Sequence, residues 1–264
     1  MATSSRATKP QGTASTGFGT TLRLDRWSVG PAVTGLVFTA FIIYSLVSSL
    51  LLLPRFGVPY EVDGYLSPFF SPLIVPGLLP EWFSPAILIL WIPLGFRTTC
   101  YYYRKAYYRA FFFDPPACAV GEPWFHRRYA METKFPFILQ NLHRLFLYLA
   151  FIPLAFLWLD ALISLRHHDE WRIGLGGVVL FVNAALLSGY SLSCHSLRHL
   201  VGGSLDCFSC TGRTRVRHSL WQRVTGLNRN HATWAWASLL SVVAGDLYVR
   251  LLAIGAISDP AIRF

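Results

Sequence analysis

Five long apolar stretches dominate this sequence and limit the folds that are open to it. They cover roughly residues 29–53, 84–108, 140–162, 174–200 and 232–256, and each is near the twenty residues that a helix needs to cross a bilayer. Only 14% of the 264 residues are charged, and 53% are hydrophobic, whereas soluble domains carry about a quarter charged residues. We therefore predict an all-α integral membrane bundle of five transmembrane helices.

The residues before the first apolar stretch have a different composition. Residues 1–25 are rich in Ser, Thr, Gly and Ala and offer little to bury, so we expect a disordered cytoplasmic tail. The first apolar stretch is too long for the core of a cleaved signal peptide. We assign residues 26–264 to one transmembrane anchor domain.

Basic residues predict the orientation of the bundle. Lys and Arg cluster in the tail and in the connections after the second and fourth stretches, whereas the opposite side has only Arg55, Arg166, Arg172 and Arg263. The positive-inside rule then places the N-terminus in the cytoplasm and the C-terminus on the opposite side of the membrane, as in a multi-pass protein. The net charge of +10 reports this topology, and no nucleic-acid-binding motif accompanies it.

This orientation gathers the sulfur-bearing residues on one side. All five cysteines fall in the cytoplasmic half or in cytoplasmic loops, and they are Cys100, Cys118, Cys194, Cys207 and Cys210. Cysteines on the reducing side of a membrane seldom form disulfides. We expect them to be metal ligands or small core residues.

A dense group of ligand-type residues follows the fourth apolar stretch. His195 and His199 are four residues apart and share one helix face, and Cys207 and Cys210 form a C-x-x-C motif after a Gly-Gly break. Two imidazoles and two thiolates are the ligands of a Rieske-type [2Fe-2S] centre. Cys118 and Cys194 are the substitute thiolates. The alternative is a structural zinc ion that staples a membrane scaffold or transporter.

The histidines also admit a haem. His143 opens the third stretch and His231 opens the fifth, at the depth of His195 and His199. A haem b between two helices needs one imidazole from each, so His143 with His195, His199 or His231 is a candidate pair.

Arg97 and Asp246 are charges inside apolar stretches. Intramembrane charges usually face the bundle interior and pair with each other, so we predict an ion pair between Arg97 and Asp246. The alternative role for Arg97 is to polarise a quinone or to hold a haem propionate. The Tyr/Arg-rich run of residues 101–109 predicts an aromatic belt, with a quinone-pocket wall or a docking face for a soluble subunit as the alternative.

Four motifs together resemble a known family. They are Tyr-Tyr-Tyr-Arg-Lys-Ala-Tyr-Tyr-Arg (101–109), Pro-Pro-Ala-Cys (115–118), Leu-Gln-Asn-Leu-His-Arg (139–144) and Cys-His-Ser-Leu-Arg-His-Leu-Val-Gly-Gly (194–203). Over residues 25–264 the chain resembles the SdhC-like membrane-anchor subunit of actinobacterial-type succinate dehydrogenase, respiratory complex II. The chain departs from dihaem anchors, because the outer half of its bundle has no intramembrane His.

The resemblance implies a flavoprotein subunit and an iron–sulfur subunit on the cytoplasmic face of a bacterial cell (inner) membrane. It implies that electrons pass from succinate through that iron–sulfur subunit to menaquinone or ubiquinone in the membrane, with no succinate-oxidising site in this chain itself. We expect the Rieske-like centre to pass these electrons on, and we expect five residues to bind quinone. These are His143, Arg144, Tyr103, Tyr107 and Arg97.

Overall fold

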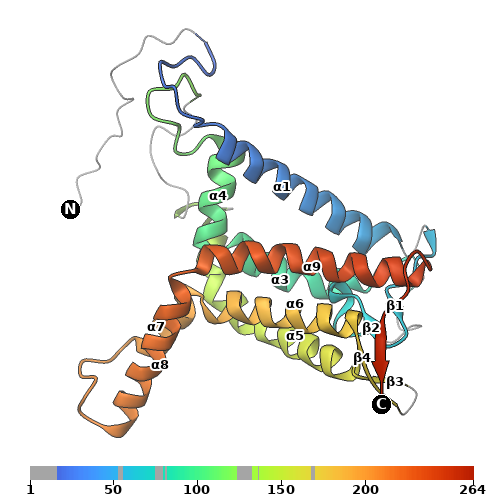
Figure 1. The fold of residues 1–264 in the computed structure, drawn as a ribbon. Helices are drawn as coiled ribbons and strands as arrows, with labels where there is room; N and C mark the ends of the chain where they lie inside the picture. The colour runs from blue at the N-terminus through green and yellow to red at the C-terminus, as the bar shows by residue number, and fades with distance from the viewer. Residues whose placement is uncertain are drawn as a thin grey trace. The chain divides into compact units, whose positions relative to one another are not determined.

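The structure is a computed structural model that describes residues 17–52, 56–74, 80, 82–123, 133–135, 137–167 and 170–264. Helices dominate these residues (Figure 1). In chain order the elements are α1 (Val29–Leu46), the π-helical turn η1 (Val47–Leu51), β1 (Glu61–Val62), β2 (Tyr65–Leu66), the 3-10 turn η2 (Pro68–Phe70), α3 (Ala86–Thr98), α4 (Tyr101–Phe112), the 3-10 turn η4 (Phe137–Leu142), α5 (His143–Ile163), β3 (Arg166–His167), β4 (Glu170–Gly174), α6 (Leu175–Leu192), α7 (His195–Gly202), α8 (Gly212–Asn228), α9 (His231–Ala253) and β5 (Ala261–Arg263).

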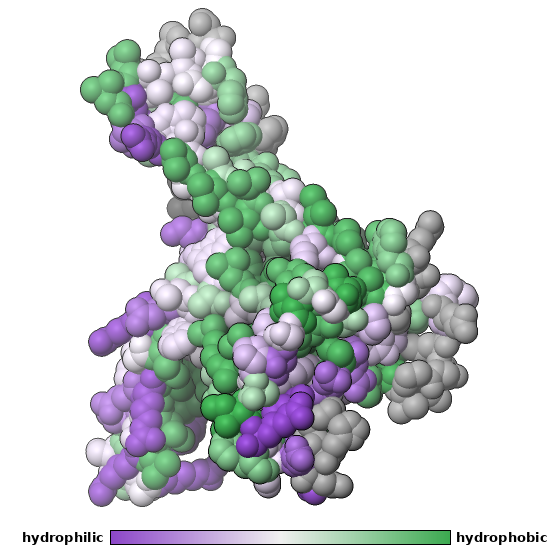
Figure 2. Space-filling model, turned by 45° about the vertical axis from the view of Figure 1, so that its right-hand side comes forward, coloured by the Kyte–Doolittle hydropathy of each residue, from purple (hydrophilic) through white to green (hydrophobic). Residues whose placement is uncertain are grey.

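Four helical segments among the described residues are long and apolar enough to cross a membrane: Val29–Leu51, Phe137–Ile163, Leu175–Leu192 and His231–Ala253. The apolar helix α3 has 13 residues, which is about 20 Å at 1.5 Å per residue. The prediction of a helical membrane bundle is confirmed, whereas the count of five crossings and the orientation stay predictions. Broad hydrophobic areas on the face drawn in Figure 2 suit helices that meet lipid.

Two predicted spans end earlier than the apolar pattern suggested. The second was expected to run over 84–108, but α3 ends at Thr98 and Cys100 has extended backbone (φ −64°, ψ 128°) before α4 begins. The fourth was expected to run over 174–200, but Cys194 is extended in the same way (φ −62°, ψ 137°) between α6 and α7. Hydropathy reports burial and cannot register one residue that leaves the helical conformation.

The described chain forms two compact units, of which the larger comprises residues 43–96 and 143–264. In this unit α5, α6 and α9 run side by side (Figure 1). Their close approach needs a small residue, since a Cβ on Gly189 of α6 would lie 2.5 Å from the Trp234 ring of α9. The Ser241 hydroxyl of α9 donates to Asn183 Oδ1 of α6 over 2.9 Å. Small residues and interhelical hydrogen bonds are what holds helices together in lipid.

The intramembrane charge Asp246 has a different partner from the predicted one. Its carboxylate lies 3.4 Å from Arg250 Nε, one turn along α9, and accepts hydrogen bonds from Tyr44 (2.7 Å) and Ser48 (2.5 Å). Asp246 is fully buried among these groups, whereas Arg97 belongs to the smaller unit, so an ion pair between Asp246 and Arg97 stays a prediction. The i, i+4 spacing of Asp246 and Arg250 brings the two charges together within a single helix.

Short strands close one end of this unit. β1 pairs with β2, and β4 lies between β3 and β5 in an antiparallel sheet. Asp259, between α9 and β5, accepts hydrogen bonds from Tyr65 (2.6 Å), Tyr248 (2.7 Å) and the Gly176 N–H of α6 (2.8 Å). One carboxylate therefore ties β2, α6 and α9 together at this end.

The smaller unit comprises residues up to 42 and 97–142. Its α4 packs on α1, where the Phe38 and Tyr103 rings lie 5.8 Å apart. The segment around Gly19 pairs with the segment around Gly121 through two backbone hydrogen bonds of 2.9 Å. These pairs involve residues 17–25 of the predicted tail, and residues 1–16 lie outside the described residues.

Candidate functional site

The predicted [2Fe-2S] ligands do not assemble into one site. His195 and His199 lie on α7 as expected, but Cys207 and Cys210 are joined in a disulfide. The expectation that these cysteines are unpaired is therefore wrong for this pair. Since each sulfur is bonded to the other, neither is available as a thiolate ligand in this state.

The substitute thiolates do not complete a metal site either. Cys194 is buried, and Cys118 is exposed in the smaller unit. Across the part of the chain that the structure describes, no three His, Cys, Asp or Glu side chains are grouped to hold a metal ion. The donor set thus fits neither the predicted cluster nor a structural zinc.

A different group of residues converges where α6 ends. The break at Cys194 turns its side chain inward, so that the residue is 1% exposed. His143, the first residue of α5, places Nε2 3.1 Å from Cys194 Sγ. The His143 ring stacks on Phe96 of α3 with centroids 4.9 Å apart and planes at 6°. A thiol and an imidazole are thus in contact inside an apolar bundle.

A second imidazole lies beside the same aromatic residues. The His231 ring at the start of α9 stacks on Tyr190 of α6 at 5.1 Å, and Tyr190 contacts Phe96 at 5.2 Å. Ser193 Oγ lies 2.7 Å from His231 Nδ1, which sets the orientation of the ring. Phe96 and Tyr190 therefore connect His143 to His231.

The remaining polar groups of this end hold α7. Arg144 Nη2 lies 2.9 Å from His199 Nδ1. The Asn228 side-chain amide of α8 donates to the Ser193 carbonyl over 2.7 Å, which fills the backbone acceptor exposed where α6 stops. We name the group of His143, Cys194, Tyr190, Ser193 and His231 the junction cluster, because it lies at the α6–α7 junction.

Three of the predicted quinone ligands belong to the smaller unit, and they are Arg97, Tyr103 and Tyr107. Arg97 donates to the Tyr103 hydroxyl, and its guanidinium lies 5.4 Å from that ring centre. Tyr107 donates to the Thr98 carbonyl over 3.0 Å. That these three residues bind quinone stays a prediction.

Outside the predicted membrane spans, burial and charge set two carboxylate pKa values. Burial of Glu122 opposes its ionisation, but hydrogen bonds from Arg109 and the Ala117 N–H outweigh burial and lower the pKa of Glu122. Burial likewise opposes ionisation of Asp259, but hydrogen bonds lower its pKa, those of Tyr65 and Tyr248 first. Both carboxylates are therefore held as anions that organise loops.

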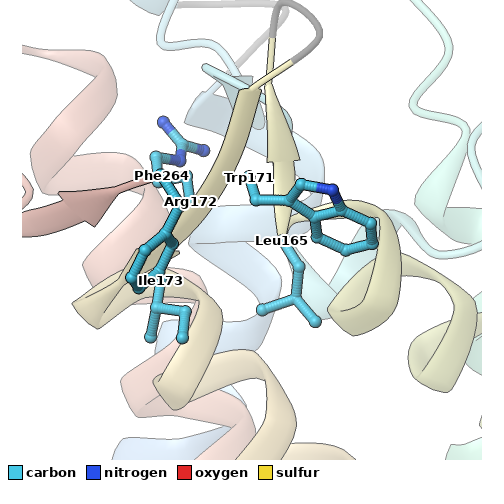
Figure 3. Close-up of a pocket in the computed structure, with 5 residues that line it drawn as sticks. All are labelled: Leu165, Trp171, Arg172, Ile173 and Phe264. Carbon is cyan, nitrogen blue, oxygen red and sulfur yellow. The ribbon is translucent and has the colours of Figure 1, made fainter.

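A pocket of about 420 Å³ lies at the strand end of the larger unit (Figure 3). Leu165, Trp171, Arg172, Ile173 and Phe264 line it, and carbon atoms form almost all of its wall. It contains none of the predicted site residues and offers no group for acid–base or redox chemistry.

Comparison with known proteins decides the family. A family model described as the actinobacterial succinate dehydrogenase subunit SdhC matches residues 29–255. The chain belongs to this SdhC family. A solved structure, the Mycobacterium smegmatis Sdh1 complex in the apo form, contains a chain that is 41% identical, with a TM-score of 0.78. The match covers 90% of this chain and 92% of that chain. No curated protein matches.

As an SdhC-family chain, this protein is a multi-pass membrane subunit of a succinate dehydrogenase, and the succinate-oxidising site is not its own. Sequence analysis selected His143, Cys194 and His231 but missed Phe96, Tyr190 and Ser193. An aromatic residue four positions before Cys194 was the available signal for Tyr190. No local pattern indicates that Phe96 stacks on His143.

Proposed function

We propose that this SdhC-family chain anchors its succinate dehydrogenase in the cell membrane and brings electrons to quinone at the junction cluster. Its partners are the flavoprotein and iron–sulfur subunits on the cytoplasmic face. The contacts within the junction cluster are the reason for placing quinone reduction there. The contact of the half-buried His143 with the buried Cys194, and the adjoining His231, put proton-bearing groups where apolar helices end.

Quinone chemistry calls for such groups. Oxidation of succinate to fumarate releases two electrons and two protons, and a quinone takes up two of each to become a quinol. An imidazole can donate a hydrogen bond to a quinone carbonyl and then pass on a proton. We assign this role to His143, with Arg144 as a second donor. Tyr103, Tyr107 and Arg97 of the smaller unit stay as proposed quinone-binding residues.

A metal-containing redox centre is the second candidate. A buried thiol beside an imidazole is soft-ligand chemistry, and this favours Cys194 and His143 over the C-x-x-C pair as the core of a [2Fe-2S] site. The two side chains do not complete a set of two thiolates and two imidazoles, so we assign no electron step to a cluster. A haem b between His143 and His231 is the remaining alternative.

The test separates quinone reduction from succinate oxidation. In the purified complex, His143→Ala should lower succinate-driven quinone reduction at least tenfold. Reduction of a soluble dye that takes electrons directly from the partner subunits should not change. His218→Ala is the matched control, because His218 lies on α8 and contacts Phe208 rather than the junction cluster. Unchanged quinone reduction in His143→Ala would refute this placement.

The visible and EPR spectra of the same samples decide between the redox candidates. A rhombic EPR signal that disappears in Cys194→Ser would support a cluster at Cys194, and sharp α and β absorption bands would support haem. A spectrum that shows only the centres of the partner subunits would leave direct transfer to quinone as the function.

A further inference from the structure

The Cys207–Cys210 pair belongs to a part of the molecule that the proposed function does not use. It lies in the loop that joins α7 to α8, beyond the end of α5, α6 and α9 (Figure 1). Cys210 is exposed and Cys207 is half-buried, so an external thiol can reach the bond. The other cysteine of the larger unit, Cys194, is buried, and so is Cys100 in the smaller unit.

The surroundings of the pair favour the reduced, anionic form of its sulfurs. Cys210 directly precedes Thr211, the N-cap of α8, whose capping box with Thr214 fixes the start of the helix. Helix N-termini and nearby cations stabilise thiolates. Arg213 and Arg215 lie in the first turn, and Arg215 Nε donates to the Ser209 carbonyl between the two cysteines. α8 itself contains no acidic residue.

The loop also connects the disulfide to the packing of the hairpin. Phe208, between the two cysteines, stacks on His218 of α8 at 4.7 Å. Trp221, one turn further along α8, lies against α7, where a Cβ on Gly202 would be 2.2 Å from its ring. Opening the disulfide therefore releases a loop whose one aromatic residue packs on α8.

We propose that Cys207 and Cys210 form a reversible thiol–disulfide couple that exchanges with glutathione or a protein dithiol. The incoming thiolate attacks one sulfur of the pair, which breaks the Cys207–Cys210 bond, forms a mixed disulfide and releases the other sulfur as a thiolate. A second external thiolate attacks the mixed disulfide. In sum the pair gains two electrons and two protons, and the external thiols leave as a disulfide.

The experiment equilibrates the purified holo-complex at a series of ratios of reduced to oxidised glutathione. After an acid quench, free thiols are tagged with a heavy maleimide and counted by gel shift. We expect the pair to gain two tags together, in proportion to the square of reduced over the first power of oxidised glutathione. Cys118, which is exposed and outside any disulfide, should be tagged at every ratio and serves as the internal control.

Two variants and one control variant make the test specific. Cys118→Ser removes one background tag and should leave the transition in place. Arg213→Gln with Arg215→Gln removes the cations that stabilise the thiolates, so the transition should need severalfold more reduced glutathione. Arg263→Gln, at the strand end, should not shift it.

Three results would overturn the proposal. The pair is a permanent structural disulfide if it stays untagged even in excess dithiothreitol, and it is an ordinary pair of thiols if it is tagged at every ratio. Tagging that requires a chelator, together with stoichiometric zinc in the reduced sample, would show a metal site instead.

Discussion

Single side chains hold this bundle together where lipid offers no hydrophobic drive between helices. The clearest case is the Asp246–Arg250 pair, which is buried and further bonded by three hydroxyl groups from Tyr44, Ser48 and Ser67. Arg250 also donates to the Val58 carbonyl over 2.7 Å. The pair therefore links α9 to α1, to η1 and to the residues that flank β1 and β2.

Removing one partner of this pair should be costly. We expect Asp246→Asn to destabilise the subunit by about 3–5 kcal/mol, because Arg250 would remain as a buried charge without its counterion. The thermal melting temperature of the complex in detergent measures this loss. The double variant Asp246→Asn with Arg250→Gln should recover part of it, and equal melting of Asp246→Asn and wild type would contradict the pairing.

Glycine contacts give a second test at this scale. Gly189→Ala places a methyl group against the Trp234 ring, so we expect a loss of about 1–3 kcal/mol from overpacking between α6 and α9. Gly226→Ala in α8 is the matched control, since no atom lies within 4 Å of its Cβ position. Better helix propensity should make that variant more stable by about 0.5–1 kcal/mol. If both variants melt alike, the close packing is absent.

The sequence indicated which side chains are important better than it indicated which other side chains they contact. Asp246 was selected because charges inside apolar stretches are rare, but depth counting assigned it to Arg97. The i, i+4 position of Arg250 was the decisive cue and was overlooked. The histidines and cysteines were placed at one end of the bundle, whereas the contact of His143 with Cys194 depends on a backbone break that hydropathy does not register.

Among the elements, the start of α6 depends on a distant residue. Its N-cap is Gly174, which has no side chain to bind the first N–H groups, and Asp259 accepts from the Gly176 N–H instead. A Cβ on Gly174 would lie 2.1 Å from that carboxylate. A helix start of this kind has no local sequence signature, because the capping residue lies more than eighty positions away.

The lowered pKa of Asp259 makes this contact depend on pH. Its ordinary pKa is 3.8, and the folded chain holds the carboxylate ionised to lower pH than the unfolded chain does. The stabilisation is therefore complete above the ordinary pKa and is lost as the pH falls through the folded-state pKa. We expect Asp259→Asn to remove this part of the fall in melting temperature below pH 4. A variant with the wild-type pH profile would contradict it.

The whole molecule poses the question of how many times the chain crosses the membrane. Four segments are long enough, and the fifth crossing that the apolar pattern predicted falls on the 13-residue helix α3 and the polar helix α4. An odd number puts the two termini on opposite sides, whereas an even number puts them on the same side. Apolar periodicity located the spans, but the breaks at Cys100 and Cys194 changed their ends.

Reporter fusions decide this topology. Alkaline phosphatase fused after Phe264 should be active and green fluorescent protein at the same point should be dark, because five crossings place the C-terminus outside. The same reporters inserted after Ser204, in the α7–α8 loop, should give the opposite result. Green fluorescent protein fused before Met1 should fluoresce, because five crossings place the two termini on opposite sides of the membrane. The same reporter result at both termini would show an even number of crossings.

The most direct test of the proposed function compares membranes from cells with and without this chain. Succinate-driven quinone reduction and succinate-driven dye reduction are measured in the membrane and soluble fractions. Without the chain, we predict that dye reduction moves to the soluble fraction and that quinone reduction is lost. The wild-type chain should restore membrane-bound dye reduction and quinone reduction, whereas His143→Ala should restore only the membrane-bound dye reduction. Quinone reduction at the wild-type rate without the chain, or with His143→Ala, would contradict the account.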